Sequence, residues 1–232
     1  MKSITLIVAS ILITSLNIYS QSLNLESDSI LTSVFSLDEI KGIQSFVTYV
    51  DDFVVKKTKE DNVEKAYHDF FDWYYEYQMK NKVTKSPIKT KYRYAFLESL
   101  DKDVFDAFWL RDSTVLTVRY KGKEYKNLSD INNIDINFKG KYMEYMKEVG
   151  EVDRDSYFID VHTKISAMGG IPGGGGLWMP EGFHHKRDFN LVKNRIWAAC
   201  YILCIHDHVD IRMKKYLKEQ RRRESKDYEV LK

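Results

Sequence analysis

Apolar residues recur every three or four positions in the first part of the chain. They form one stripe from Ser36 to Lys57, and the same spacing returns from Val63 to Tyr75. This period of about 3.6 residues is that of an amphipathic α-helix. Ser36 and Glu39 have the spacing of a capping box, and Asp61 can cap the second helix. The pattern predicts two helices that pack against each other across a short charged turn.

The period changes near the middle of the chain. Residues 114–120 (TVLTVRY) favour a β-strand by composition, and residues 121–122 (Lys-Gly) form a turn signal before residues 123–126. Residues 134–138 alternate apolar and polar side chains, which is typical of a third short strand. We therefore predict a small β-hairpin insertion at about residues 114–138.

The C-terminal part favours one long helix from Asp188 to about Arg222. Residues 196–205 are apolar on every side, and a helix with that pattern is buried. The sequence thus predicts a mainly α protein, a single helical domain built around a long buried C-terminal helix. From about residue 223 the highly charged chain is expected to form a flexible tail.

Two cysteines lie in this apolar run, Cys200 and Cys204. They are four residues apart, so on a helix their Cβ atoms point the same way, which opposes relaxed disulfide geometry. We predict two small buried core residues without a bridge.

The first 22 residues have the order of a cleavable secretory signal. Lys2 is followed by an apolar run at residues 4–16 and a polar segment at residues 17–22. Cleavage after Ser22 fits the small-residue rule, with Ser20 at position −3, and cleavage after Ser20 is a second option. A buried N-terminal helix is the alternative to a signal. We predict a mature domain at residues 23–232 that is soluble, periplasmic or secreted, and without a stable membrane anchor, because no other segment reaches about 18 apolar residues.

Charge and aromatic content narrow the class of partner. Lys and Arg number 36 and Asp and Glu number 34, which argues against a nucleic-acid partner. The 16 tyrosines and 12 phenylalanines suit a tyrosine-rich core or a contact surface for another exported protein.

A glycine-rich segment at residues 171–180 is the first candidate binding site. It contains Gly173, Gly174, Gly175 and Gly176, followed by Trp178 and Met179. Such a segment cannot be the interior of a helix or strand, and it lacks the lysine of a phosphate-binding P-loop. Two interpretations stay open. The loop is an exposed contact with Trp178 and Met179 as its apolar anchor, or the glycines turn a corner and Trp178 packs into the core.

The aromatic segment at residues 70–77 (FFDWYYEY) is the second candidate. Helical spacing places most of these rings in the core, whereas Trp73 and Tyr77 fall together on the other side. We keep Trp73 and Tyr77 as candidate binding residues.

The third candidate is a zinc site made of His184, His185, His206 and Asp210. Imidazole and carboxylate are zinc ligands, and a free fourth position would permit water activation. The spacing matches no known ligand motif, and all four residues also suit capping or half-buried positions.

Together these features predict an exported protein, and its sequence contains no recognisable catalytic motif. No serine-nucleophile motif is present, and no motif of a known family covers enough of the chain to transfer a site. We expect a non-enzymatic protein- or ligand-binding module of the inhibitor or immunity type, with no cofactor. The alternative is a metal-dependent hydrolase that uses the histidine and aspartate cluster with zinc.

Overall fold

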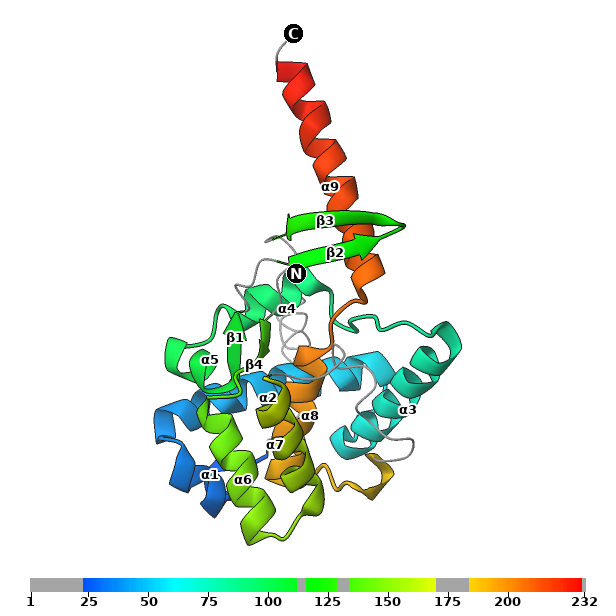
Figure 1. Cartoon of the computed structure of the whole chain (residues 1–232). Coiled ribbons are helices and arrows are strands. Elements are labelled where there is room, and N and C mark those ends of the chain that lie inside the picture. Colours follow the sequence, from blue (N-terminus) through cyan, green and yellow to red (C-terminus); the bar gives the residue numbers. More distant parts are fainter. Residues whose placement is uncertain (1–22, 112–115, 129–133, 170–183, 231–232) are drawn as a thin grey trace, which may run out of the picture.

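The computed structural model describes residues 23–111, 116–128, 134–169 and 184–230. The expected mainly helical chain with a small β-hairpin is confirmed (Figure 1). The helical elements are η1 (Leu25–Ser27), α1 (Ser29–Val34), α2 (Leu37–Thr58), α3 (Val63–Asn81), α4 (Thr90–Leu97), α5 (Lys102–Phe108), α6 (Lys141–Val152), α7 (Ser156–Met168), η3 (His184–Lys186), α8 (Val192–Cys204) and α9 (Val209–Val230). The strands are β1 (Trp109–Arg111), β2 (Leu116–Tyr120), β3 (Lys123–Leu128) and β4 (Ile134–Ile136). None of the helices within these ranges is long and apolar enough to cross a membrane. The predicted signal peptide lies outside the described residues.

Helices α2 and α3 are the two amphipathic helices that the sequence predicts, and they pack against each other. The capping box of α2 is confirmed, since Ser36 and Glu39 each bond the backbone of the other. The cap of α3 is Asn62, whose side chain accepts from the backbone N–H of Lys65 at 2.9 Å. The expected cap, Asp61, lies one residue too early to reach that group.

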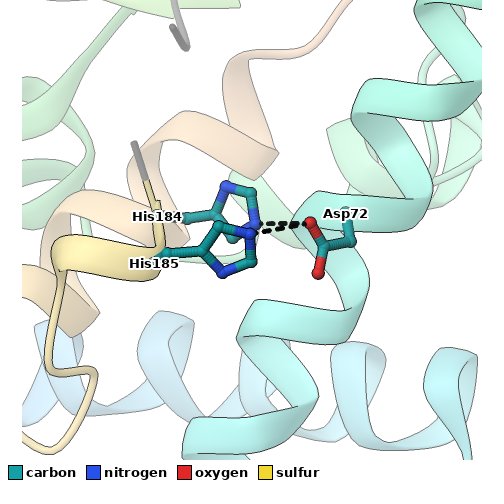
Figure 2. Close-up of side chains that lie close together, drawn as sticks. All are labelled: Asp72, His184 and His185. Carbon is teal, nitrogen blue, oxygen red and sulfur yellow. Dashed lines mark hydrogen bonds and ion pairs between the residues drawn. The ribbon is translucent and has the colours of Figure 1, made fainter. Parts of the chain in front are cut away.

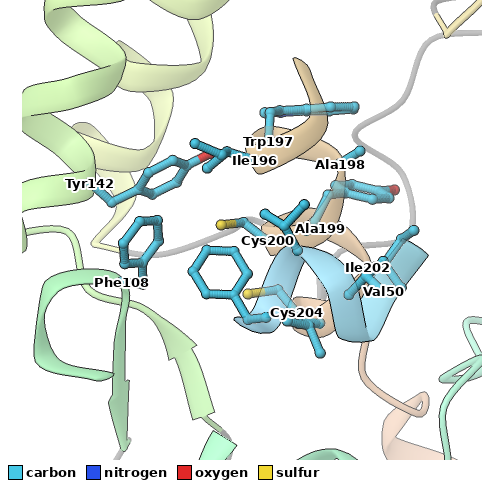
Figure 3. Packing of buried hydrophobic residues seen from close by; sticks show 14 of the residues in the cluster. Val50, Phe108, Tyr142, Ile196, Trp197, Ala198, Ala199, Cys200, Ile202 and Cys204 are labelled. Atoms are coloured by element: carbon cyan, nitrogen blue, oxygen red, sulfur yellow. The ribbon is translucent and has the colours of Figure 1, made fainter. Parts of the chain in front are cut away.

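Helix α8 lies at the centre of the core. Every residue from Asn194 to Cys204 is buried, because α2 and neighbouring helices surround α8 (Figure 1). Figure 3 shows Phe108 of α5 and Tyr142 of α6 facing its cysteine side chains. Cys200 and Cys204 are buried and free, as predicted.

The single long helix expected from Asp188 to about Arg222 was wrong, because the chain breaks at residues 205–208. The buried part is α8 alone. Helix α9 extends away from the helical body (Figure 1), and its backbone stays helical to Val230, past the start of the expected flexible tail.

Tertiary contacts stabilise the non-helical conformation of residues 205–208. Arg93 of α4 donates to the carbonyl of Ile205, just beyond α8. The backbone N–H of His208 donates to the carbonyl of Thr84 at 2.8 Å. Partners distant in sequence therefore satisfy backbone groups that a continuous helix would pair internally. Residues 205–208 contain no glycine or proline, so nothing local marks the stop.

The strands form two separate antiparallel pairs. β2 and β3 make the expected hairpin, which packs on α9 through Leu128 and Met213. The expected third short strand is β4, and it pairs with β1 so that Ile136 lies opposite Trp109. Ile134 and Ile136 are each 1% exposed, so burial in the main core decides this pairing.

Candidate metal centre

Three potential metal ligands meet where α3 faces η3. They are Asp72 of α3 with His184 and His185 of η3 (Figure 2). The Nε2 atoms of His184 and His185 lie 2.9 and 3.3 Å from the same oxygen, Oδ1 of Asp72. One ligand atom from each residue falls within 4.8 Å of the other two.

Aromatic packing fixes the two segments that carry these residues. Phe71, the neighbour of Asp72, is buried, and its ring lies 5.8 Å from the ring of His184. Phe189 follows η3, is fully buried, and stacks on Tyr67 of α3 at 5.0 Å. The anchored rings bring η3 against α3 and place the three polar groups at the edge of the core.

The three residues differ in access to solvent. His184 is 2% exposed, whereas the side chains of Asp72 and His185 are 50% and 56% exposed. The inner side of the cluster is therefore held by the core, and its outer side is open to water.

A third histidine borders the cluster. His68 lies one turn before Asp72 on α3, and its ring centroid is 6.1 Å from His184 and 6.2 Å from His185. The rings of His68 and His185 are stacked, with planes 13° apart. The Nδ1 atom of His68 is buried and has no hydrogen-bond partner among the described residues.

Burial favours the neutral form of His184 and His68. It lowers the pKa of His184, against the opposing effect of the Asp72 carboxylate, and the other two histidines lower it further. Burial is also the main cause of the lowered pKa of His68. The neutral imidazole is the form that binds a metal ion.

The donor set fits zinc. Zinc bonds to imidazole nitrogen and carboxylate oxygen are about 2.0–2.2 Å long, so neighbouring ligands of a tetrahedral ion lie roughly 3.3 Å apart. The two measured separations, 2.9 and 3.3 Å, are close to that value. A borderline-soft ion such as zinc suits this mixture of nitrogen and oxygen better than calcium or magnesium does.

The structure brings together two of the four residues that the sequence suggested for zinc. His184 and His185 converge, but their third partner is Asp72. His206 lies elsewhere, with its Nδ1 atom 2.8 Å from Nη2 of Arg93. Asp210 pairs instead with His208, whose Nδ1 atom is 3.5 Å away. Because the helix is broken at residues 205–208, His206 and Asp210 do not share one helical face.

Sequence reasoning missed Asp72 and the neighbouring His68. A histidine and an aspartate four residues apart on a helix share one face, which is a usable signal for a two-residue metal-binding pair. Asp72 stands inside the aromatic segment at residues 70–77 and His68 just before it, where the pattern is typical of core residues.

The other candidate binding residues are described only in part. The glycine segment with Gly173 to Gly176, Trp178 and Met179 lies outside the described residues. Trp73 and Tyr77 do lie side by side on α3, with ring centroids 6.0 Å apart. Trp73 is 36% exposed, but the ammonium of Lys57 lies 3.8 Å from its ring centroid, so one face is already occupied.

Comparison of the chain with protein-family models, with curated proteins and with solved structures gives no match.

Proposed function

We propose that this protein binds a divalent transition-metal ion, with zinc the best fit, through Asp72, His184 and His185. One observation carries the proposal: two imidazole nitrogens and a carboxylate oxygen from segments distant in sequence lie within 4.8 Å of one another. The two nitrogen–oxygen separations, 2.9 and 3.3 Å, are close to those between neighbouring zinc ligands. As a ligand-binding module without a catalytic motif, the protein would keep the non-enzymatic role that its sequence suggests.

The shape of the cluster also supports a second candidate, metal-dependent hydrolysis. Structural zinc sites are closed by four protein ligands, whereas catalytic sites have three and keep one position for water. Here three ligands converge, and the exposed side chains of Asp72 and His185 leave the outer side accessible. Zinc held by these residues would lower the pKa of a bound water molecule to about 7, which is close to neutral pH.

We further propose that the protein works outside the cytoplasm, in the periplasm or after secretion. The support is the order of positive charge, apolar run and polar segment at residues 1–22. Another exported protein remains the proposed partner, supported by the high tyrosine content.

Zinc titration of the metal-free protein tests the metal proposal. We expect one zinc ion per chain in competition with a chromophoric chelator. Asp72→Asn and His185→Ala should each weaken binding by more than about 100-fold, since loss of an outer-shell partner alone costs about 10–100-fold. Both positions are half-exposed, so these variants should fold.

His208→Ala is the matched control. His208 is a partly exposed histidine beside a carboxylate, as His185 is, but it lies outside the cluster. The His208→Ala variant should bind zinc with the affinity of the wild type. The proposal fails if the wild type binds no stoichiometric zinc, or if all three variants bind it equally well. Nitrophenyl ester hydrolysis tests the second candidate. The hydrolase proposal fails if the zinc-loaded wild type hydrolyses the ester no faster than the Asp72→Asn variant does.

A further inference from the structure

A cavity of about 600 Å³ lies between the segment at residues 85–94 and the beginning of α9. None of the residues that line this cavity belongs to the metal cluster. Its volume falls within the range of sites for small molecules, roughly 300–1,000 Å³. The break between α8 and α9 forms part of its wall, through His206 and Asp207.

The lining of this cavity carries an excess of positive charge. Two carboxylates line it, Asp207 and Glu219, against six cationic side chains. The cations are Lys85, Lys89, Lys91, Arg93, Arg212 and Lys215. Asp207 is already satisfied, because it accepts from the backbone N–H of Ser86 at 3.0 Å and pairs with Lys215. The charge of Asp207 also acts on Arg212, but Asp207 makes no ion pair with Arg93.

Arg93 is a buried cation whose partners are all uncharged. It is 1% exposed and donates to the Ile205 carbonyl and, at 3.2 Å, to Oγ of Ser86. Its Nη2 atom lies 2.8 Å from Nδ1 of His206, an imidazole that burial and the nearby positive charges keep neutral by lowering its pKa. Among the described residues no carboxylate lies within ion-pair distance of Arg93, and its Nε atom is buried without a hydrogen-bond partner.

A buried charge of this kind is costly unless an opposite charge compensates it. Arg212, in the first turns of α9, adds a second half-buried guanidinium to the same wall. Tyr94 and Tyr216 add aromatic surface beside the two arginines. The cavity thus combines two guanidinium groups, exposed lysines and apolar rings.

We propose that this cavity binds a small organic molecule that carries a phosphate group. A phosphate dianion matches the charge excess better than a single carboxylate does, and guanidinium groups pair with it through charge-assisted hydrogen bonds. Arg93 compensates the buried end of the ligand, Arg212 binds it from α9, and Tyr94 and Tyr216 contact its organic part. The exposed lysines at positions 85, 89 and 91 attract the anion from solution.

Two matched probes test this proposal: phenyl phosphate and benzoate, which share a ring and differ in the anionic group. Calorimetric titration of the metal-free protein should show phenyl phosphate binding at least tenfold more tightly than benzoate. Inorganic phosphate should compete with phenyl phosphate for the cavity. Metal-free Asp72→Asn should bind phenyl phosphate as the wild type does, which separates this cavity from the metal cluster.

The decisive variant is Arg212→Gln, with Arg221→Gln as its control on the exposed surface of the same helix. Arg212→Gln should weaken phenyl phosphate binding about tenfold or more, since a charge-assisted hydrogen bond is lost. Arg221→Gln should bind as the wild type does. Arg93→Ala is less suitable, because Arg93 also holds the break after α8. The proposal is overturned if phenyl phosphate does not bind at millimolar concentration, if benzoate binds equally well, or if the two arginine variants behave alike.

Discussion

The carboxylate of Asp51 on α2 lies 3.0 Å from Nη1 of Arg195 on α8, and each side chain is only 3% exposed. Tyr67 of α3 donates its hydroxyl to the same carboxylate at 2.8 Å, and Nε of Arg195 donates to the carbonyl of Phe189 at 2.6 Å. Burial raises the pKa of Asp51, and the nearby charge of Arg195 opposes that rise. The ion pair and the Tyr67 hydrogen bond together link α2, α3 and α8, and Arg195 also binds the segment that follows η3.

Removing one partner of this pair should be strongly destabilising. We expect Asp51→Ala to lower the free energy of unfolding by about 3–5 kcal/mol, because Arg195 is left buried without its counter-charge. Urea unfolding followed by circular dichroism measures the loss. Asp52→Ala, at the exposed neighbouring position, is the control and should change stability by no more than about 0.5 kcal/mol. A loss below about 1 kcal/mol for Asp51→Ala would show that the pair is not a major contributor.

Mild acid should destabilise the protein through His206. Burial is the main cause of its lowered pKa, and the charges of Arg93 and Arg212 add to it. Below about pH 6.5, the ordinary pKa of histidine, His206 is therefore protonated in the unfolded state but stays neutral in the folded state until the pH falls further. The free energy of unfolding must then fall as the pH drops from 7 to 5, by up to about 1.4 kcal/mol per pH unit for this one group.

Urea unfolding at pH 7, 6 and 5 measures this slope. His206→Asn retains an acceptor for Arg93 but cannot be protonated in this range, so its slope should be smaller than that of the wild type. Equal slopes would mean that His206 does not control the acid response. His68, His162 and His184, whose pKa values burial also lowers, should account for the slope that remains.

Zinc should raise the melting temperature in a pH-dependent way. At a free zinc concentration of 100 times Kd, binding to the folded state alone adds about 2.7 kcal/mol, or roughly 5–10 °C for a chain of this size. The shift should shrink as the pH falls, because protons compete with zinc for the imidazoles. Since burial lowers the pKa of His184, part of the shift should persist below pH 6.5.

Thermal unfolding with and without zinc provides the measurement, and a chelator should reverse the effect. His185→Ala should lose the shift, whereas His208→Ala should keep it. A shift of the same size in both variants would place zinc elsewhere on the chain.

The two cysteines should be inert in the folded protein. Both are buried and free, and burial raises the pKa of each thiol, which disfavours the reactive thiolate. A chromogenic disulfide reagent should therefore label neither residue under native conditions and both in denaturant. Rapid labelling of the native protein would contradict the buried position of α8.

Local patterns were sufficient for those parts of the fold that depend on local chemistry. The period of apolar residues placed α2 and α3, and the spacing of Ser36 and Glu39 identified a capping box that the structure contains. The all-apolar run correctly marked α8 as the buried helix. Each of these features depends on residues within a few positions of one another, where helix geometry relates sequence spacing directly to distance.

Only the tertiary structure decided which distant residues meet. Asp72 and His184 are 112 residues apart, and aromatic packing between α3 and the segment after η3 brings them together. The break after α8 likewise depends on Arg93, which lies 112 residues before the carbonyl that it binds. Sequence alone therefore determined α2, α3 and the buried run of α8, together with the types of residue available for a site. The contacts between segments, and with them both candidate sites, follow from core packing, which no local spacing encodes.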